Sequence, residues 1–450
     1  MEGAAGTRGA ARAPRRGEQV ELEIDSLAFG GRGVARADGF VVFVAGALPG
    51  DRVRAEVTKG KKRFAEARTV ELLQPSPDRL PDRCLHGGEP CPGAPWQGLP
   101  YEQQLHHKQE QVAEALDRIG GLEGYALEEI VPAAEQWRYR NKLEYSFGED
   151  DNGEVTLGFH ARGRWDLIVD AHDCHLASEQ GNEARNAVRE WARLEHVPAF
   201  DRRNHRGVLR NLAVREGRRT GQVQTRLVTM EARFPRPPVD LHTIVEEEAG
   251  SSDGPTGVLG EERLREELSG LQLEMSHGAF FQTNTEMAER LYAVAAEFAG
   301  LSGSERVFDL FCGIGTIGLT MARGAGEVWG LEIVPEAIAD AERNARANKI
   351  ENAHFMAANA RTGVRPLVEK AGKPDVVVVD PPRAGLSQKI VRRVIECEAQ
   401  KIVYVSCNPT TLAPNATQLT EAGYRLRRVR PVDMFPQTPH IECVALFEKA

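Results

Sequence analysis

The sequence predicts a multidomain α/β protein with a small all-β barrel at the N-terminus, a central α+β region and a C-terminal domain built on a parallel sheet. The chain has 450 residues, about three times the length of an average domain. Short alternating apolar runs fill its first part, whereas apolar strands alternate with helical patterns after Met275. Hydrophobic residues make up 41% of the chain and charged residues 27%, as in ordinary globular proteins.

The first predicted domain is a β-barrel over residues 19–75, preceded by a flexible basic tail over residues 1–18. Alternating apolar residues between glycine-rich turns are typical of a small barrel similar to the oligonucleotide-binding (OB) fold. Its late loop, Lys59 to Phe64, holds four cations beside an aromatic ring. That combination would suit a surface that follows an RNA backbone, but a solvated hairpin tip explains the charges equally well.

The central domain is predicted over residues 76–272. A docking helix over residues 101–120 carries an apolar face and ends at two glycines. Strands and polar loops follow, and Asp201 to Arg219 contains seven arginines, which fit either a solvated surface or a surface that faces RNA. The acidic stretch Glu246 to Asp253 is predicted to be a mobile loop.

The last domain, residues 273–450, is predicted to have a Rossmann-like fold, with helices on both faces of a parallel sheet. The expected helices and strands are 286–299, 306–311, 327–333, 335–348, 375–380 and 401–406. Ligands of such sheets bind at the carboxyl ends of the strands. Functional residues are therefore expected at these ends.

The composition excludes several classes of protein. No run of 18 apolar residues exists, so no membrane span and no membrane partner are expected. The N-terminal tail lacks the apolar core of a secretory signal, which favours a cytoplasmic location. Seven cysteines are too few for a disulfide scaffold and are better interpreted as core residues, metal ligands or nucleophiles. With a net charge of −9, binding to a polyanion would depend on local basic faces.

A cofactor site is predicted where strand 306–311 enters the turn formed by Gly313, Gly315 and Gly318. The G-x-G-x-x-G spacing alone is shared by several cofactor classes. The next strand ends at Glu332, at the distance where an acidic side chain reaches the ribose hydroxyls of an adenosine. Asp309 would repel the pyrophosphate of a dinucleotide but could pair with the ammonium of a methionyl group. This favours S-adenosylmethionine over a dinucleotide.

Three polar clusters follow or precede strands of the same sheet. Their key residues are Asp380, in Asp-Pro-Pro-Arg, Cys407, in Ser-Cys-Asn-Pro, and Glu442, in His-Ile-Glu-Cys. A cysteine after a strand is more often a buried core residue. Here Asn408-Pro409 ends the strand and leaves the thiol at the rim, while Glu442 is a candidate base.

A thiol and a base suit one reaction, methylation of carbon 5 of uracil. This carbon is too weak a nucleophile to attack a sulfonium until a thiolate adds to carbon 6. A base must then remove the proton from carbon 5. Cys407 and Glu442 would form this pair, and because free cysteine titrates near ~8.5, Cys407 would need a polar or cationic neighbourhood.

Five motifs stand in the order found in the RNA uracil-5-methyltransferase family, which this chain resembles. They are Phe280 to Asn284, Asp309 to Gly315, Asp380 to Gly385, Ser406 to Pro409 and His440 to Glu442. The resemblance implies that Cys407 is the nucleophile and Glu442 the proton acceptor. It also implies an S-adenosylmethionine pocket lined by Gln282, Phe311, Glu332 and Asp380, beside Asp309 and the glycine turn. A flipped uridine is expected near Asp380 and Gln282.

The resemblance extends to the first two domains. The barrel is similar to the TRAM domain, an RNA-binding barrel, and Tyr139 to Lys142 and Leu209 to Leu212 match the family's central domain. Family members with a TRAM domain usually act on 23S rRNA, which makes 23S rRNA the leading expected substrate and rRNA processing the expected process. The tRNA T-loop uridine is the alternative substrate. A monomer is expected.

A damaged cysteine motif accompanies the resemblance. Relatives often hold a [4Fe-4S] cluster on C-x5-C-x2-C and one distant cysteine, but here only Cys84, Cys91 and Cys174 match, and Ala94 replaces the third cysteine. The first spacing is also one residue longer. Four thiolates are the usual requirement. The cysteines therefore imply a labile cluster, a substitute ligand such as His86 or Glu89, a zinc-binding or vestigial set, or no cluster.

The chain departs from the family pattern at two places. Thr316 stands where relatives can carry Asn, and Ala358-Asn359 where Gly-Asp is common. These changes affect local cofactor contacts without changing the catalytic residues.

Two rival functions are disfavoured by the residues present. A non-catalytic RNA-binding protein would have lost Cys407, Glu442 or Asp380, and all three are present. A dinucleotide-dependent oxidoreductase is disfavoured by Asp309.

Overall fold

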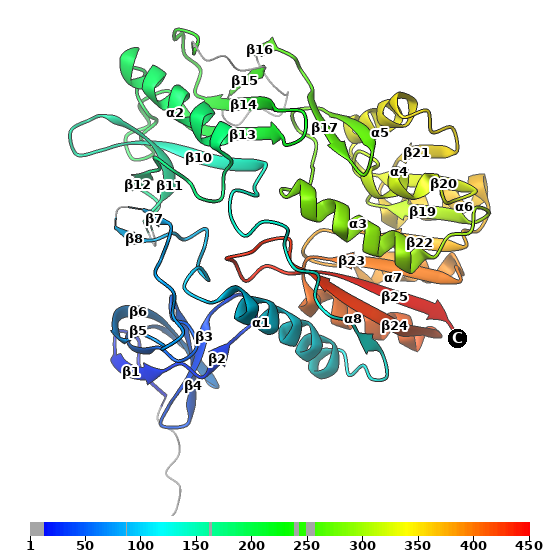
Figure 1. The fold of residues 1–450 in the computed structure, drawn as a ribbon, viewed down its shortest axis with the longest axis horizontal. Coiled ribbons are helices and arrows are strands. Elements are labelled where there is room, and N and C mark those ends of the chain that lie inside the picture. The colour runs from blue at the N-terminus through cyan, green and yellow to red at the C-terminus, as the bar shows by residue number, and fades with distance from the viewer. Residues whose placement is uncertain (1–12, 87, 162–163, 238–242, 249–256) are drawn as a thin grey trace, which may run out of the picture. The chain divides into compact units, whose positions relative to one another are not determined.

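The structure is a computed structural model that describes residues 13–86, 88–161, 164–237, 243–248 and 257–450 (Figure 1). It contains two compact units. The first comprises residues 1–83, 90–111 and 436–440, and the second comprises residues 84–89, 112–435 and 441–450. Of the tail expected over residues 1–18, residues 1–12 lie outside the described residues. None of the helices in the described residues is long and apolar enough to cross a membrane.

The first unit is built around the predicted β-barrel, whose six strands form one sheet in the order β1-β5-β6-β4-β3-β2. The strands are β1 (Gln19–Glu23), β2 (Ser26–Leu27), β3 (Gly33–Ala37), β4 (Phe40–Ala45), β5 (Arg52–Gly60) and β6 (Phe64–Gln74). Alternate residues of β5, namely Val53, Ala55 and Val57, point into the core because side chains alternate between the faces of a strand. The sheet curls so that β1 also packs on β3.

In the rest of the first unit, residues 90–111 bind the loop over residues 436–440 through hydrogen bonds. The segment over residues 90–111 includes most of α1 (Tyr101–Glu114), the N-terminal part of the predicted docking helix. The buried Gln104 on α1 donates its amide to Gln437 Oε1 at 2.9 Å and accepts the Gln437 backbone N–H at 2.8 Å. These paired bonds satisfy both ends of a buried amide, as burial requires. The helix continues as a π-helical turn, η1 (Ala115–Ile119), that belongs to the second unit.

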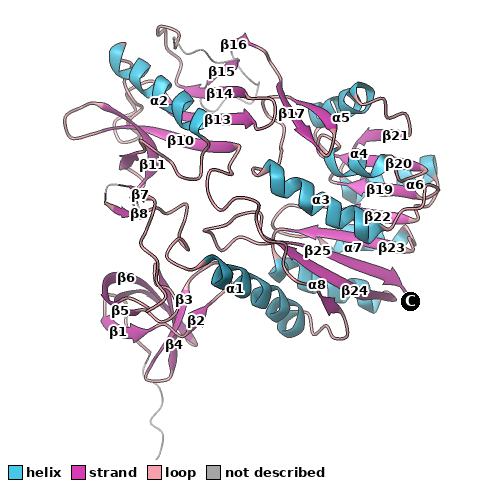
Figure 2. Ribbon diagram, in the orientation of Figure 1, coloured by secondary structure: helices cyan, strands magenta, loops and turns pink. Residues whose placement is uncertain are grey.

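Residues 76–83 and 90–111 of the predicted central domain belong to the first unit. The rest of that domain lies in the second unit and contains a seven-stranded sheet covered by a helix (Figure 2). Its strand order is β12-β11-β10-β13-β14-β15-β16. The elements are β10 (Lys142–Glu149), β11 (Val155–His160), β12 (Ile168–Asp170), α2 (Glu179–Leu194), β13 (Leu209–Gly217), β14 (Gln222–Thr229), β15 (Thr243–Glu248) and β16 (Gly257–Gly260). Trp191 of α2 is buried against this sheet.

Part of one loop that the sequence predicted forms a strand in the structure. The acidic stretch Glu246 to Asp253 was expected to be a loop, but Glu246 to Glu248 belong to β15, so the prediction is wrong for these three residues. β15 pairs in parallel with β14, and this long-range pairing overrides the low strand propensity of glutamate. The remainder of that stretch lies outside the described residues.

The C-terminal domain confirms the predicted Rossmann-like fold, with an eight-stranded sheet in the order β21-β20-β19-β22-β23-β25-β24-β9. Its strands are β19 (Arg306–Leu310), β20 (Glu327–Glu332), β21 (Ala353–Ala357), β22 (Val376–Val379), β23 (Lys401–Ser406), β24 (Tyr424–Val432), β25 (Glu442–Lys449) and β9 (Ala126–Leu127). β19 to β23 are parallel, whereas β25 is antiparallel to both of its neighbours. The short link from β24 to β25 leaves no room for a crossover helix, so β25 must return in the opposite direction.

Helices cover both faces of this sheet (Figure 1). They are α3 (Thr285–Ala299), α4 (Thr316–Ala322), α5 (Pro335–Ala347), α6 (Ala360–Ala371), α7 (Gln388–Glu396) and α8 (Pro409–Glu421). Two short hairpins complete the fold, one formed by β17 (Leu264–Leu268) and β18 (Leu271–Met275), the other by β7 (Leu85–His86) and β8 (Glu89–Pro90). α3 packs on β23 and β25, while α7 packs against both α6 and α8. Each helix and strand expected between residues 286 and 406 is present within one residue at either end.

Candidate functional site

The glycine turn lies at the point where the sheet order reverses, because β20 lies on one side of β19 and β22 on the other. Such a switch point is the usual ligand crevice of an open α/β sheet. Gly313 and Gly315 adopt positive φ angles of 55° and 84°, which favour glycine. A Cβ on Gly315 would lie 3.1 Å from the ring of Phe355. The turn therefore brings backbone atoms that carry no side chain close to the crevice.

Asp309 is fully buried at the end of β19. Its Oδ2 accepts the backbone N–H of Gly318 at 2.8 Å, while Oδ1 has no hydrogen-bond partner within the described part of the chain. Burial, followed by the nearby Glu332 carboxylate, raises the pKa of Asp309 to about 7. An unpartnered buried carboxylate oxygen suits an ammonium donor.

Glu332 is held in place by backbone N–H groups. Its Oε2 accepts from Gly313 N at 3.3 Å, and its Oε1 accepts from Ile333 N at 2.7 Å and from Val334 N at 3.1 Å. Ile333 is 59% exposed and Val334 45% exposed, unusually high for large apolar side chains. Sequence reasoning did not single out these two residues. Their exposed apolar surface beside Glu332 could support the face of an adenine ring.

Phe311 has a positive φ of 69° although it carries a bulky side chain. Its backbone N–H bonds to Leu331 O at 2.8 Å, which anchors the strained turn to β20. Strained backbone of this kind persists only where surrounding structure holds it, and it is common at functional sites. The predicted cofactor residue therefore lies at a strained position beside the glycine turn.

Gln282 is buried just before α3 and is linked to the central domain through Asn141. The Asn141 side-chain amide donates to Gln282 O and to Thr285 Oγ1, both at 2.9 Å, and its backbone N–H donates to Thr283 O at 2.9 Å. Asn141 was noted in the sequence only as part of a matching motif. The structure brings it to the segment that carries Gln282.

The two departures from the family pattern have local partners. Thr316 Oγ1 lies 3.4 Å from the buried Tyr292 hydroxyl. Asn359 caps α6, because its side-chain oxygen accepts the N–H of Arg361 at 2.9 Å. Both residues therefore have a structural role at the ends of helices beside the crevice.

The candidate nucleophile and base lie at the same edge of the sheet. β23 and β25 pair so that Ser406 stands opposite Cys443, which places Cys407 and Glu442, the residues next to this pair, at its open end. Asp380 follows β22, the other neighbour of β23. Cys407 is partly exposed, whereas Glu442 is only 4% exposed. The structure thus brings these three predicted residues together.

The electrostatics of this cluster differ from the neighbourhood expected for Cys407. Burial raises the pKa of Cys407 to about 12, the Glu442 and Asp380 carboxylates contribute to this rise, and Arg383 opposes it. Burial and then Asp380 raise the pKa of Glu442 well above its ordinary value. Burial and then Asp309 raise the pKa of Asp380 to about 7. At neutral pH the RNA-free site therefore favours a protonated Cys407 thiol and an uncharged Glu442, whereas Asp380 is ionised in part of the molecules.

The predicted metal ligands do not provide four thiolates. In the second unit, Cys84 Sγ lies 3.5 Å from His86 Nε2, and the Cys84 thiol is close enough to affect the pKa of Cys174. Cys91 belongs to the first unit. The other cysteines serve the C-terminal domain, so the donor set does not fit a cluster held by four cysteines. Burial raises the pKa of Cys174, as is usual for a thiol in apolar surroundings.

Comparison with known proteins agrees with this architecture. A model of the tRNA (uracil-5-)-methyltransferase family matches residues 258–450, and a TRAM domain model matches residues 15–70. An uncharacterized RNA methyltransferase of Halalkalibacterium halodurans is 36% identical over 95% of this chain and 96% of its own length. The chain belongs to the RNA uracil-5-methyltransferase family.

Other members of the family support the same assignment. An uncharacterized RNA methyltransferase of Caldanaerobacter subterraneus is 37% identical over 97% of this chain and all of its own length. The crystal structure of Pyrococcus abyssi tRNA (uracil-54, C5)-methyltransferase in complex with S-adenosyl-L-homocysteine has a TM-score of 0.78 and 29% identity, covering 95% of this chain and 100% of that one. The predicted enzyme class, the TRAM domain and the cofactor S-adenosylmethionine are thereby confirmed.

Proposed function

We propose that this methyltransferase transfers a methyl group to carbon 5 of a specific uridine in RNA through a covalent bond to Cys407. The observation that carries the proposal is the register of β23 and β25, which puts Cys407 and Glu442 at one end of the sheet beside Asp380. Parallel strands direct their carboxyl ends to the cofactor crevice. The thiol, the base and the methyl donor would therefore meet at one edge.

S-adenosylmethionine supplies the methyl group as an electrophilic sulfonium. Its adenosine would lie along Glu332, with the ribose hydroxyls on the carboxylate and the adenine against Ile333. Its methionyl part would lie by Phe311, Gly313 and Gly315, where Asp309 Oδ1 is left for the ammonium. Gln282 and Asp380 would close the pocket next to the reacting carbon.

Cys407 is partly exposed and would act as the nucleophile after releasing its proton to solvent water. The thiolate adds to carbon 6 of the uracil, and the electrons of the carbon 5–carbon 6 double bond move toward carbon 4 and its oxygen. Asp380 has a pKa of about 7, so its neutral form can donate a hydrogen bond to the developing enolate. Carbon 5 then takes the methyl group, and the sulfonium leaves as a neutral thioether.

Glu442 would complete the reaction as the general base. Its carboxylate removes the proton from carbon 5, the double bond to carbon 6 forms again, and the thiolate leaves. A raised pKa makes this carboxylate a stronger base than an exposed glutamate. The carbon 5 proton thus passes to Glu442, the bonding electrons return to the carbon 5–carbon 6 double bond, and Cys407 leaves as a thiolate that takes a proton back from solvent water.

The proposed substrate is 23S rRNA, on the ground of the TRAM domain. A tRNA T-loop uridine is the second candidate, because the Pyrococcus abyssi enzyme, which acts on tRNA uracil 54, is similar over almost the whole chain.

A direct test incubates the protein with labelled S-adenosylmethionine and unmodified 23S rRNA or tRNA transcripts and analyses the nucleosides for 5-methyluridine. Label in 23S rRNA alone is the expected result. Label in tRNA alone would keep the chemistry and replace the substrate. No 5-methyluridine in either RNA would contradict the proposed function.

Replacing Asn141 with alanine is expected to weaken cofactor binding. The change removes two side-chain hydrogen bonds that hold Gln282 and Thr285. Loss of a buried hydrogen bond costs about 1–3 kcal/mol, so we expect the Kd for S-adenosylmethionine to rise about tenfold. Isothermal titration calorimetry measures this Kd. Asn152→Ala, in an exposed turn, is the matched control, and an unchanged Kd for Asn141→Ala would show that the network does not position Gln282.

A further inference from the structure

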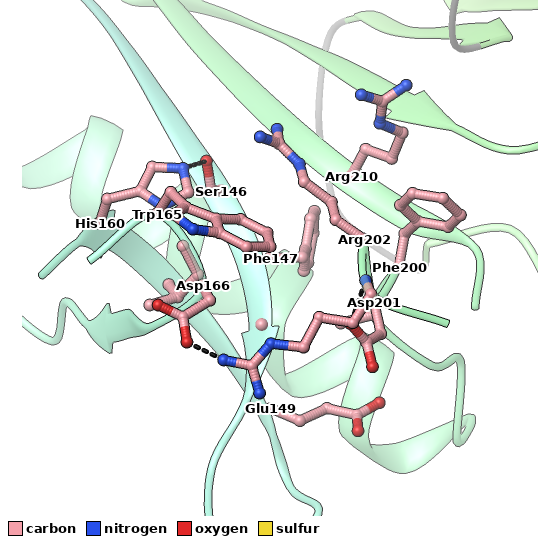
Figure 3. A pocket seen from close by; sticks show the side chains of 14 residues that line it. Ser146, Phe147, Glu149, His160, Trp165, Asp166, Phe200, Asp201, Arg202 and Arg210 are labelled. Carbon is pink, nitrogen blue, oxygen red and sulfur yellow. Dashed lines mark hydrogen bonds and ion pairs between the residues drawn. The ribbon is translucent and has the colours of Figure 1, made fainter. Parts of the chain in front are cut away.

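A cavity of about 190 Å³ opens on the central domain, away from all the residues assigned to the catalytic cluster. It lies between the ends of β10 and β11 and the loop before β13 (Figure 3). Its volume is below the roughly 300–1,000 Å³ of pockets that enclose drug-sized ligands. The space therefore suits one planar group rather than a whole dinucleotide.

The walls of the cavity are aromatic. Trp165 stands on one side and Phe200 on the other, as Figure 3 shows. The Trp165 side chain is 58% exposed, which is unusual for the largest apolar residue in a loop. The guanidinium of Arg203 lies 6.0 Å from the indole centre and also pairs with Asp166. The indole is thus held in place while one of its surfaces stays accessible.

Two guanidinium groups stand at one rim of the cavity without a carboxylate partner. Among the described residues, neither Arg202 nor Arg210 forms an ion pair, and Arg210 Nε is buried with no hydrogen-bond partner. The Arg210 guanidinium lies 5.5 Å from the centre of the Phe200 ring. Because a guanidinium fork matches the oxygens of a phosphate, this rim is suited to an anion.

The carboxylates of the cavity are placed apart from this rim. Asp166 is already neutralised by Arg164 and Arg203. Asp201 and Glu149 lie on the side opposite Arg202 (Figure 3). They offer acceptors for the N–H groups on the edge of a base. This arrangement corresponds to one nucleotide. The cations at one end match its phosphate, the aromatic surface matches the face of its base, and the acceptors at the other end match the edge of its base.

We propose that this cavity binds a second, unstacked nucleotide of the RNA substrate, distinct from the uridine that is methylated. Its base stacks on Trp165, and its phosphate is held by Arg202 and Arg210. Sequence-specific RNA recognition commonly uses single-stranded bases stacked on aromatic side chains. The inference rests on the proposed RNA methylation and adds a specificity site to it. It also assigns a role to part of the arginine-rich stretch Asp201 to Arg219.

The test compares full-length wild-type protein with Trp165→Ala by fluorescence anisotropy on the same 23S rRNA and tRNA transcripts as the methylation test. Because the variant loses the ring on which the base stacks, we expect the Kd for RNA to rise about tenfold or more. The KM for RNA should rise by a similar factor while kcat at saturating RNA and the Kd for S-adenosylmethionine stay unchanged. Trp165→Phe should restore most of the affinity, because a phenyl ring also stacks.

The arginines are tested by the salt dependence of RNA binding. Each phosphate that the protein no longer neutralises reduces the slope of log K against log salt by about 0.7 for a single strand, so Arg202→Ala with Arg210→Ala should reduce the slope by about that amount. Arg425→Ala, an exposed arginine on β24, is the matched control and should leave the slope unchanged. A 4-thiouridine crosslink that maps to the peptides around Trp165 or Phe200 would support the site independently.

The outcomes separate this inference from the proposed function. Normal methylation with an unchanged KM and Kd in Trp165→Ala would overturn the nucleotide site and leave the function intact. A loss of RNA affinity in Trp165→Ala, with no methylation by the wild type, would support the site and contradict the function. A wild-type protein that binds neither RNA would overturn the site as well.

Discussion

Replacing Cys407 with alanine is expected to abolish methylation while leaving S-adenosylmethionine bound with unchanged affinity. The proposed reaction requires a sulfur atom on carbon 6 of the uracil, and alanine cannot form that bond. Loss of a covalent nucleophile lowers kcat by an amount on the order of 10⁶-fold in other enzymes. Transfer of labelled methyl groups to RNA measures the rate, and calorimetry measures the affinity for the cofactor.

Cys397→Ala is the matched control for Cys407→Ala. Cys397 is fully buried after α7, and its thiol bonds to Arg393 O at 3.3 Å, remote from the catalytic strand ends. This variant should methylate RNA at the wild-type rate. If Cys407→Ala retained normal turnover, the covalent mechanism would be wrong, even if 5-methyluridine were still the product.

Replacing Glu442 with glutamine is expected to trap the protein on its RNA. The variant can still add Cys407 to carbon 6 and methylate carbon 5, but it lacks the carboxylate that removes the remaining proton. Turnover should fall by about 10²- to 10⁴-fold, the usual contribution of a general base. The covalent complex should appear as a band that migrates more slowly than the free protein on a denaturing gel and contains both labelled methyl and RNA.

The double variant with Cys407→Ala and Glu442→Gln distinguishes a covalent adduct from tight binding. It should give no denaturant-resistant band, because the linking sulfur is absent. A band that persists in the double variant would assign the link to another residue. Full turnover by Glu442→Gln alone would show that a different group removes the proton, and Asp380 would be the first alternative because it lies in the same cluster.

Several parts of the fold followed directly from local sequence patterns. The apolar run of β22 and the glycine turn after β19 predicted a parallel sheet with a cofactor crevice, and strands β19 to β23 confirm the parallel pairing. The carboxyl ends of parallel strands share one edge of a sheet, so the sequence alone could place Asp380 and Cys407 together. Glu442 was harder to place, because its strand runs in the opposite direction.

Other features depended on contacts between residues far apart in the chain. Asn141 reaches Gln282 across 141 positions, and its sequence motif carries no sign of that partner. The aromatic cavity joins Trp165 to Phe200 and Arg210 from separate loops and strands. The strand β15 within a stretch rich in acidic residues was missed for the same reason, since its pairing with β14 outweighs local propensity.

The sequence by itself determined the class of sheet, because hydrophobic periodicity is a local property of the chain. It also determined the enzyme family, because five of the family's motifs stand in the chain in order. The catalytic roles of Cys407 and Glu442 stay predictions. Only the tertiary structure decided the electrostatics of the site. The pKa of Cys407 is raised by burial and by the carboxylates of Glu442 and Asp380, whereas a reactive thiol needs a polar or cationic neighbourhood. Burial and the distances between charges depend on how strands from distant segments pack, and no local pattern encodes them.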